Sequence, residues 1–441
     1  MKVRIHAGRA AGEVLVPPSK SVAHRMLICA GLAEGVSTVR NAGDCEDILA
    51  TLDCLSRLGA DCRQEGDTVT VRGGLLRTAP TEALPCRESG STLRFLIPLA
   101  LTARFPVAFT GYGRLPERPQ TVYETICAGQ GLTFTREGQT IRVCGPLRGG
   151  DFRVAGNISS QFITGLLFAL PTLPESSRIT LLPPVESRSY IDLTLDVLKK
   201  FGIRAEWENE TSLAVPCGQR FTPCDCEAEG DWSAGAFWEA LGRMGDNRVR
   251  IPNLNPNSRQ GDRVCTAYFD ALRGGFTTLS LADCPDLGPM LFAYAAATHG
   301  GTFTEVGRLR IKESDRIGAM REELAKFGVE LSDSGDTVTV GGGTLHAPDA
   351  PLNGHGDHRI VMALAILATR TGGEIEGAEA VRKSYPSFWK DLEALGIHCE
   401  IKASPRNPDG ANHNLQSRIF RQTIQKSAGC SRATGKSFCE V

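Results

Sequence analysis

The sequence lacks an apolar run long enough to cross a membrane and carries almost no net charge. Its longest apolar stretches cover residues 95–103 and 360–369, about half of the ~20 residues that a transmembrane helix needs. The 49 basic and 50 acidic side chains leave a net charge of −1. The chain therefore has no broad basic surface of the kind that coats nucleic acid. We expect a protein that binds neither membranes nor nucleic acid, although a local basic cleft for acidic small molecules is compatible with this balance.

Paired cysteines and a secretory leader are also missing. The 15 cysteines are an odd number and are scattered, unlike a disulfide framework or the CxxC pairs of zinc sites. Cys224 and Cys226 form the one close pair, and their spacing is too tight for the usual structural zinc motifs. The first residues do not contain the ~7–15-residue apolar core of a signal peptide. These observations predict reduced thiols, no bound metal and a cytoplasmic location.

A repeated pattern organises the 441 residues. Residues 55–74 (LSRLGADCRQEGDTVTVRGG) and 324–343 (LAKFGVELSDSGDTVTVGGG) share a helix end, a glycine and two alternating strands. Weaker copies occur at 124–145, 195–218, 268–281 and 388–401. We expect six units of ~70 residues, each with a helix that ends at a glycine in the left-handed conformation. These glycines are Gly59, Gly131, Gly202, Gly275, Gly328 and Gly396.

Between the repeated signatures lie segments that are apolar on nearly every helical face. They cover residues 21–33, 91–101, 160–170, 233–242, 285–297 and 358–369. A helix that is apolar all round must be buried on every side. The simplest packing is an inside-out α/β arrangement, with these helices inside and the sheets outside.

Six units divide naturally into two domains of three units each. The first strand, residues 2–7, precedes the first full unit, so we expect it to complete the second domain, with the chain crossing twice near 13–16 and 227–231. This predicts one discontinuous domain of residues 1–14 plus 230–401 and a second domain of residues 15–229. Residues 402–441 form a basic, polar tail without core periodicity, and we expect that tail to be disordered.

Charged and hydroxyl-bearing clusters stand where many of these helices begin. A helix N-terminus presents free N–H groups and a partial positive charge, so each cluster is a potential anion site. Taken singly, each is equally well explained as a helix cap. The combination favours a site for several phosphate and carboxylate groups, because many cations occupy the same structural position. They are Lys20, Arg25, Arg94, Arg188, Lys312, Arg316, Arg359 and Lys383, with Arg114 and Arg118 in the loop 111–120.

In chain order, these motifs resemble those of the EPSP synthase (3-phosphoshikimate 1-carboxyvinyltransferase) family. They are KSVAHR (20–25), ESGSTLR (88–94), LPERP (115–119), SSQF (159–162), IKESDR (311–316), GDHR (356–359) and RKSYP (382–386), and the similarity covers about residues 1–401. The resemblance implies two domains, each with three βαβαββ units around buried parallel helices.

The resemblance also implies an activity in the shikimate pathway, which leads to chorismate and the aromatic amino acids. The carboxyvinyl group of phosphoenolpyruvate would be transferred to the 5-hydroxyl of shikimate 3-phosphate, with release of phosphate, by addition and elimination as the domains close. It implies a monomer that needs no metal and no organic cofactor.

Roles for individual residues follow from the same resemblance. Shikimate 3-phosphate is expected to contact Lys20, Ser21, Arg25, Ser159, Ser160, Gln161, Ser187, Asp286 and Lys312. Phosphoenolpyruvate is expected to contact Lys20, Gly90, Ser91, Arg118, Gln161, Arg316, Arg359 and Lys383. Asp286 is expected to take the proton of the attacking hydroxyl, assisted by Lys20, whose pKa should fall among so many cations. Glu313 is expected to protonate the methylene carbon, with His358 as a stabiliser or alternate acid.

Some positions depart from the family pattern. Glu88 stands where many members carry Asn, which adds a negative charge beside the expected phosphoenolpyruvate pocket and leaves the affinity for glyphosate, the family's inhibitor, open. Arg308 stands about where a substrate-contacting Asn is common, so the resemblance assigns it no role.

Two other functions remain open. UDP-N-acetylglucosamine carboxyvinyltransferase shares the fold and the donor, but its loop usually carries a reactive cysteine, and the loop 111–120 has none. A non-catalytic sensor of phosphorylated metabolites is the second alternative. The joint presence of Lys20, Asp286, Glu313 and His358 argues against it.

Overall fold

The computed structural model describes residues 1–402, and residues 2–401 form one compact unit. The expectation of a disordered tail falls on residues 403–441, which lie outside the described residues.

Three four-stranded sheets in the first half of the chain share one strand order. They are β14 (Asp225–Glu227), β3 (Val36–Arg40), β5 (Thr68–Arg72), β4 (Asp61–Glu65); β6 (Leu84–Pro85), β7 (Val107–Thr110), β9 (Thr140–Cys144), β8 (Thr133–Glu137); and β10 (Asp151–Ala155), β11 (Ser177–Leu182), β13 (Ser212–Val215), β12 (Glu206–Trp207). In each sheet the first pair is parallel and the next pair is antiparallel. This order is what a βαβαββ unit produces. α3 (Gly90–Leu101) connects β6 to β7 and α5 (Ser160–Ala169) connects β10 to β11, whereas β14 reaches β3 from the end of the first half, and a hairpin closes each sheet.

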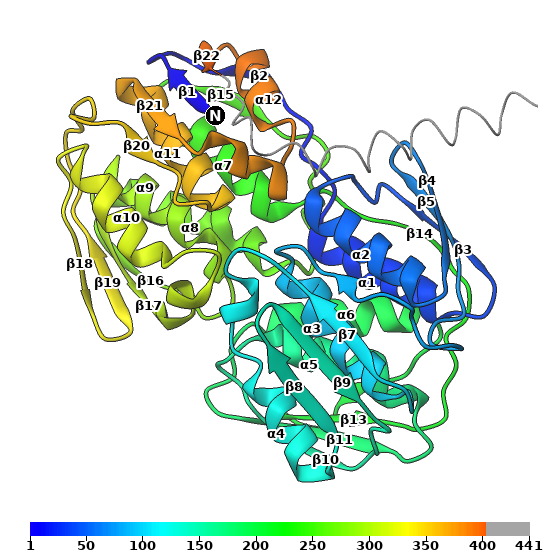
Figure 1. The fold of residues 1–441 in the computed structure, drawn as a ribbon. Helices are drawn as coiled ribbons and strands as arrows, with labels where there is room; N and C mark the ends of the chain where they lie inside the picture. The colour runs from blue at the N-terminus through cyan, green and yellow to red at the C-terminus, as the bar shows by residue number, and fades with distance from the viewer. Residues whose placement is uncertain (403–441) are drawn as a thin grey trace, which may run out of the picture. The chain divides into compact units, whose positions relative to one another are not determined.

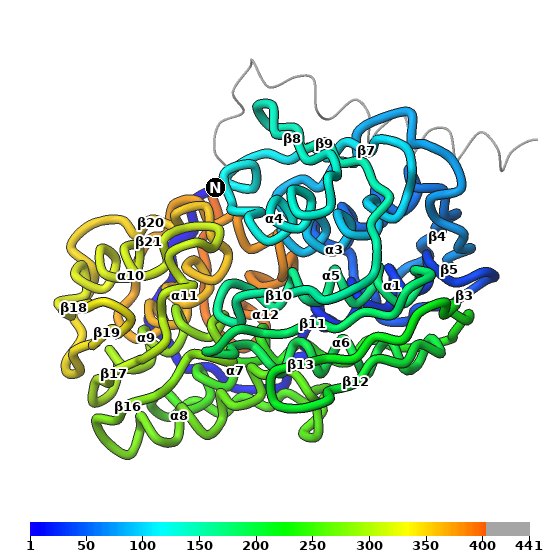
Figure 2. Tube along the Cα trace, turned by 90° about the horizontal axis from the view of Figure 1, so that it is seen from below, coloured from blue at the N-terminus to red at the C-terminus, as the bar shows by residue number. Residues whose placement is uncertain are grey.

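The second half repeats this plan and uses the start of the chain to complete it. One sheet is β16 (Thr277–Ser280), β17 (Gly301–Thr304), β19 (Thr337–Val340), β18 (Leu331–Ser334). Another is β20 (Leu352–Asn353), β21 (Gly373–Glu376), β1 (Lys2–Ile5), β22 (Cys399–Lys402), and the third pairs β15 (Arg248–Arg250) with β2 (Ala11–Glu13). The first strand thus lies beside the last ones, as the blue and orange segments show in Figure 2.

The segments predicted to be apolar all round form α1 (Lys20–Leu32), α3 (Gly90–Leu101), α5 (Ser160–Ala169), α7 (Trp232–Arg243), α9 (Gly288–Ala296) and α11 (His358–Thr371). Every residue of α9 is buried, and α3 and α5 each have one residue that is not, Ser91 and Gln161. The amphipathic helices are α2 (Glu46–Arg57), α4 (Thr121–Gln130), α6 (Arg188–Lys200), α8 (Cys265–Gly274), α10 (Arg316–Ala325) and α12 (Phe388–Ala394). The predicted fold class, with buried helices inside sheets, is confirmed (Figure 1).

One of the six glycine predictions is wrong. Gly131, Gly202 and Gly328 have φ of 67°, 79° and 80°, in the left-handed region that a side chain disfavours. Gly275 instead has φ 153° and ψ −179°, so the chain leaves α8 in an extended conformation.

The two chain crossings lie side by side. The Ser19 amide donates to the Glu229 carbonyl at 2.7 Å, and the Asp231 amide donates to the Pro17 carbonyl at 2.9 Å. Just outside these bonds, β2 joins a sheet of the second half and β14 joins a sheet of the first half. We propose that the domain boundaries fall here, giving residues 15–229 and residues 1–14 plus 230–401.

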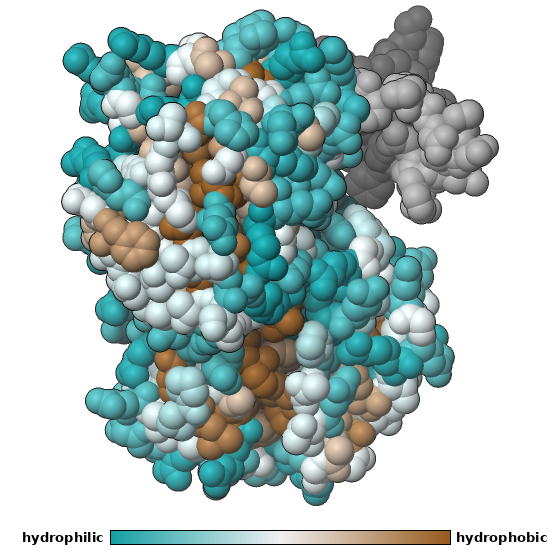
Figure 3. All heavy atoms as spheres, turned by 90° about the vertical axis from the view of Figure 1, so that its left-hand side faces the viewer, coloured by the Kyte–Doolittle hydropathy of each residue, from teal (hydrophilic) through white to brown (hydrophobic). Residues whose placement is uncertain are grey.

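Burial follows the same division. Buried apolar residues between Val22 and Ala228 make one continuous core, built largely from α1, α3 and α5. Large hydrophobic side chains that stay exposed among the described residues are scattered: Leu15, Val36, Tyr112, Leu182, Phe276, Ile311 and Ile401. The face in Figure 3 is accordingly mostly hydrophilic, with brown residues visible mainly in its recesses. In the part of the chain from 1 to 402, no helix is both long and apolar enough to cross a membrane.

Candidate active site

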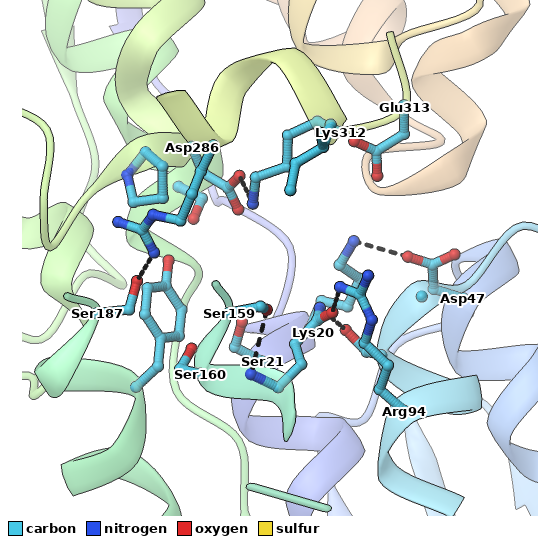
Figure 4. A pocket seen from close by; sticks show the side chains of 18 of the residues that line it. Lys20, Ser21, Asp47, Arg94, Ser159, Ser160, Ser187, Asp286, Lys312 and Glu313 are labelled. Atoms are coloured by element: carbon cyan, nitrogen blue, oxygen red, sulfur yellow. Dashed lines mark hydrogen bonds and ion pairs between the residues drawn. The ribbon is translucent and has the colours of Figure 1, made fainter. Parts of the chain in front are cut away.

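The beginnings of helices from both halves of the chain line one pocket. α1, α3, α5 and α6 contribute from the first half, and α10, α11 and the short 3-10 helices η4 (Pro285–Leu287) and η5 (Gly307–Ile311) contribute from the second half. Figure 4 shows Asp286, Lys312 and Glu313 facing Lys20, Ser159, Ser160 and Arg94 across the open space. Convergent helix N-termini favour bound anions.

Sixteen of the seventeen predicted site residues line this pocket, and Lys383 is the exception. They are Lys20, Ser21, Arg25, Gly90, Ser91, Arg118, Ser159, Ser160, Gln161, Ser187, Asp286, Lys312, Glu313, Arg316, His358 and Arg359. The lining contains eight lysines and arginines but four aspartates and glutamates, an excess of four positive charges in a chain whose net charge is −1. The pocket is therefore a concentrated anion site.

Asp286 is surrounded by cations. Its Oδ1 lies 3.2 Å from Lys312 Nζ and 3.0 Å from Arg316 Nη1, and its Oδ2 lies 3.0 Å from Arg359 Nη2. Burial by itself would raise the pKa of Asp286, but these three cations hold it well below its ordinary range. The carboxylate is therefore ionised, which is the form that a proton acceptor needs, while the same cations make it a weaker base.

A second carboxylate, Glu313, is held in the same way. It lies 2.8 Å from Arg316 Nη2, 3.5 Å from Arg118 Nη2 and 3.6 Å from Lys383 Nζ. Burial opposes ionisation, yet the cations, Arg118 first among them, keep the pKa of Glu313 well below its ordinary value. Lys383 Nζ also lies 3.7 Å from Glu88, so Lys383 reaches the site through Glu313 although it does not line the pocket.

The expected fall in the pKa of Lys20 is wrong. Its Nζ donates to Asp47 Oδ2 at 2.7 Å, as Figure 4 shows. Burial lowers the pKa of Lys20, but Asp47, Cys45 and Glu313 together raise it above the ordinary value. Lys20 is therefore protonated, which suits an anion-binding cation and disfavours an assisting base.

His358 is neutral. Burial lowers its pKa to about 3, and neither ring nitrogen has a hydrogen-bond partner among the described residues. A neutral imidazole can donate an N–H to a developing negative charge. This favours the stabilising role predicted for His358 over the role of alternate acid.

The opposite wall carries cations that face neutral acceptors. Arg25 donates to Thr194 Oγ1 at 2.8 Å and to the Ser21 carbonyl at 2.6 Å. Arg94 donates to Gln161 Oε1 at 2.9 Å, and Gln161 Nε2 donates to Ser91 Oγ at 2.9 Å. Burial lowers the pKa of both arginines to about 10. A bound anion would compensate these two buried charges.

At Gly90 the backbone of α3 comes close to Arg118. A Cβ at this position would lie 2.7 Å from Arg118 Nη1. Contacts below ~3 Å force a neighbour to shift, so a larger residue would move Arg118.

Sequence reasoning missed the residues that hold the site residues in place. Asp47 binds Lys20 from α2, and Asp357 accepts from Arg316 Nε at 2.9 Å while it caps α11 through the Arg359 amide at 2.9 Å. The motif GDHR points to Asp357, yet helix capping alone explains an aspartate there. No comparable signal in the sequence points to Asp47.

Clusters that would suit a metal lie elsewhere. Among residues 1–402, the candidate groups are His6, His398 and Glu400, and Glu322, Glu323 and His355. None of these residues lines the pocket. That the reaction needs no metal or cofactor stays a prediction.

Behind the pocket residue Ser233, a buried carboxylate gives a pH-dependent prediction. Asp262 accepts from the Ser233 hydroxyl, and burial raises the pKa of Asp262 to about 7. Ionisation of this group therefore favours the unfolded chain increasingly as pH rises from about 4 to about 7. We expect Asp262→Asn to raise the melting temperature by ~2–4 °C at pH 8 and to have little effect at pH 4.

The matched control is the exposed Asp270 on α8, which pairs with Arg243 at 3.2 Å. Asp270→Asn should give no gain at pH 8. A gain of equal size at both pH values for Asp262→Asn would show that its ionisation is not the cause.

Comparison with known sequences agrees with this geometry. The chain matches the family model for EPSP synthase (3-phosphoshikimate 1-carboxyvinyltransferase) over residues 6–392. A curated relative named 3-phosphoshikimate 1-carboxyvinyltransferase from Clostridium kluyveri is 39% identical over 416 residues, covering 89% of this chain and 97% of that protein. A protein of the same name from Clostridium perfringens is 38% identical over 418 residues, covering 90% and 98%.

Solved structures support the fold. An EPSP synthase from Acinetobacter baumannii superposes with a TM-score of 0.74 at 24% identity, covering 91% of this chain and all (100%) of that chain. The enolpyruvyl transferase NikO from Streptomyces tendae gives a TM-score of 0.71 at 16% identity, covering 92% and 99%. With the family model spanning most of its length and relatives well above 30% identity that are matched almost end to end, the chain belongs to the EPSP synthase family.

Proposed function

We propose that this protein transfers the carboxyvinyl group of phosphoenolpyruvate to the 5-hydroxyl of shikimate 3-phosphate. The observation that carries the proposal is the pocket itself, where an excess of four positive charges surrounds two ionised carboxylates, Asp286 and Glu313. The two substrates together bring two phosphates and two carboxylates, which suit this excess of positive charge. Family membership supplies the reaction class.

The pocket offers each substrate residues from both halves of the chain. The hydroxyls of Ser159, Ser160 and Ser187, with Lys312, would bind shikimate 3-phosphate, as expected from the resemblance. The guanidinium groups of Arg118, Arg316 and Arg359 would bind phosphoenolpyruvate, since their planar forks match phosphate and carboxylate oxygens. Glu313 lies within 4 Å of Arg118 and Arg316, which would place it beside the donor.

In the addition step, the 5-hydroxyl oxygen bonds to C2 of phosphoenolpyruvate while C3 gains a proton. Asp286 would accept the hydroxyl proton, and protonated Glu313 would deliver a proton to C3. Arrival of the donor's negative charges among Arg118, Arg316 and Lys383 weakens their hold on Glu313 and thereby raises its pKa toward the range of a proton donor. In the elimination step, the methyl group would return a proton to the Glu313 carboxylate, a C=C bond would form, and the C–O bond would break with its electron pair leaving on phosphate.

Lys20 and His358 would stabilise the negative charge that develops on the leaving phosphate. Lys20 is protonated and lies in the pocket lining, where it would offset the charge that develops on the tetrahedral intermediate and on phosphate. His358 would add a neutral N–H donor. Packing the reactants in this pocket holds the two reacting atoms together and excludes water.

The test is phosphate release from phosphoenolpyruvate by the purified chain, with either shikimate 3-phosphate or UDP-N-acetylglucosamine as acceptor. We expect release with shikimate 3-phosphate alone. Release with UDP-N-acetylglucosamine alone would identify the related transferase. Binding of phosphorylated ligands by calorimetry without any release would identify a sensor.

Monomeric state and cytoplasmic location are also part of the proposal. The support for both is family membership. Light scattering of the purified chain at micromolar concentration should give the mass of one chain, 47.4 kDa.

A further inference from the structure

Arg308 is a pocket cation that the family resemblance leaves without a role. It lies in η5, four residues before Lys312, and its side chain is 10% exposed. Its Nη1 donates to Ser187 Oγ at 2.5 Å, and its Nη2 donates to the Ala282 carbonyl. The guanidinium therefore connects η5 to the start of α6, where a substrate-binding serine is expected.

Ser187 is held in an unusual backbone conformation at this place. Its φ of 55° and ψ of 35° are left-handed, a region that costs about 1 kcal/mol or more for a residue other than glycine. Its amide donates to the Ala282 carbonyl at 3.0 Å, the same oxygen that accepts from Arg308. Backbone and side chain of Ser187 are thus both tied to partners shared with Arg308.

The contact with Arg308 decides what the Ser187 hydroxyl can do. A serine hydroxyl has one hydrogen to donate and two lone pairs to accept with. Arg308 uses a lone pair, so the hydrogen is left to donate to another group, and the pocket lies beside it. Figure 4 shows Ser187 at the edge of the open space that Ser160 and Lys312 also line.

Arg308 has a buried counter-ion, Glu186. Glu186 Oε2 lies 2.6 Å from Arg308 Nε, yet the two groups are not aligned for a hydrogen bond. Burial raises the pKa of the Glu186 carboxyl, although Arg308 acts in the opposite direction. The Glu186 carboxylate therefore offsets part of the positive charge of Arg308.

We infer that Arg308 is a positioning and specificity residue for the phosphate group of the acceptor, and that Glu186 limits its strength. Arg308 would orient the Ser187 hydroxyl as a donor to a dianionic phosphate monoester and place a positive charge behind it. Glu186 would offset part of that charge. This inference rests on the proposed function, since it assumes that shikimate 3-phosphate binds at Ser187.

The experiment measures the affinity of the full chain for shikimate 3-phosphate and for unphosphorylated shikimate by calorimetry. Losing a charged hydrogen-bond donor costs ~1.5–3 kcal/mol, equivalent to ~10–100-fold in Kd. We expect Arg308→Gln to weaken the binding of shikimate 3-phosphate by that factor and to leave the affinity for shikimate unchanged. The kcat at saturating substrates should stay within ~3-fold of the value for the unaltered chain. Arg308→Lys should recover part of the loss.

Glu186→Gln should shift the affinity in the opposite direction. Removing the carboxylate beside Arg308 should lower the Kd for shikimate 3-phosphate at least ~3-fold. The matched control is Arg310→Gln, which removes an equal charge from the same 3-10 helix but acts on Asp333 and Asp315. It should leave both affinities unchanged.

Three results would overturn the inference: unchanged affinity in Arg308→Gln, equal losses for shikimate 3-phosphate and shikimate, or a loss in Glu186→Gln as large as in Arg308→Gln. The last two results would show that Arg308 and Glu186 stabilise the local structure and do not select for the phosphate group. If Arg308→Gln does not fold, the affinities of Arg308→Lys and Glu186→Gln for shikimate 3-phosphate and shikimate still test the inference. Failure of the unaltered chain to bind shikimate 3-phosphate would instead refute the proposed function.

Discussion

Replacing Glu313 with Gln is expected to lower kcat at least ~100-fold, because the amide cannot deliver a proton to the methylene carbon. The KM for phosphoenolpyruvate should stay the same or fall. Glu313 lies among Arg118, Arg316 and Lys383, so its neutralisation strengthens the attraction of these cations for the anionic donor. This combination of low kcat and unchanged or lower KM is the signature of lost chemistry rather than lost binding.

The measurement is steady-state phosphate release with both substrates varied, compared with Glu322→Gln. Glu322 is 64% exposed on the neighbouring helix α10 and lies 3.9 Å from His355. Its replacement should change neither constant by more than ~2-fold. A kcat for Glu313→Gln within ~3-fold of the unaltered chain would remove Glu313 from the proton transfer.

Arg316→Leu is expected to lower the free energy of unfolding by about 3–5 kcal/mol at pH 7. The guanidinium is 1% exposed and contacts three carboxylates, Asp357 at 2.9 Å, Asp286 at 3.0 Å and Glu313 at 2.8 Å. Leucine fills part of the space but removes one cation from each carboxylate. Asp286 and Glu313 keep other cationic partners, whereas Asp357 loses the guanidinium that pairs with it. Denaturant unfolding monitored by fluorescence gives the value.

The same variant has a defined pH dependence. Burial raises the pKa of Asp286, Glu313 and Asp357, but cations including Arg316 outweigh burial and hold all three pKa values below the ordinary ones. A depressed folded-state pKa stabilises the fold above the unfolded pKa, and that contribution is lost as pH falls through the folded pKa. The deficit of Arg316→Leu should therefore be largest at neutral pH and shrink below about pH 4.

Arg321→Leu on the same helix is the control. Arg321 is 44% exposed and pairs with Asp333, and an exposed pair of this kind is worth less than about 1 kcal/mol. Equal losses for Arg316→Leu and Arg321→Leu would contradict the central structural role of Arg316.

How far the sequence predicts this molecule depends on the range of the interaction concerned. Periodicity and composition are local, so they predicted the buried helices and the repeated strand hairpins at residues 55–74 and 324–343. Motifs at the helix starts predicted most of the side chains that meet, because the fold brings most of these starts to one pocket, although Lys383 and Arg188 do not line it. Gly275 shows the limit of the local rule, since the chain after α8 runs directly into an extended strand.

Contacts between residues far apart in the chain could not be predicted from the sequence. The pKa of Lys20 was expected to fall because the sequence shows its cationic neighbours but not Asp47, which approaches from α2. Arg308 meets Ser187 across 121 positions, and nothing in either segment indicates the contact. The structure was therefore needed to find the ion pairs and pKa shifts of the site, whereas the sequence motifs alone predicted most of the residues that line it.

The most direct test of the account follows the oxygen that bridges carbon and phosphorus in phosphoenolpyruvate. With this atom labelled as oxygen-18, the chain is incubated with shikimate 3-phosphate, and phosphate and the organic product are analysed by mass spectrometry. Carboxyvinyl transfer breaks the C–O bond, so the account predicts that all of the label leaves with phosphate and that the acceptor gains an enolpyruvyl ether. Label retained in the organic product would mean that the P–O bond is broken, and phosphate released without the ether would mean that no carboxyvinyl group is transferred. Either result would contradict the account.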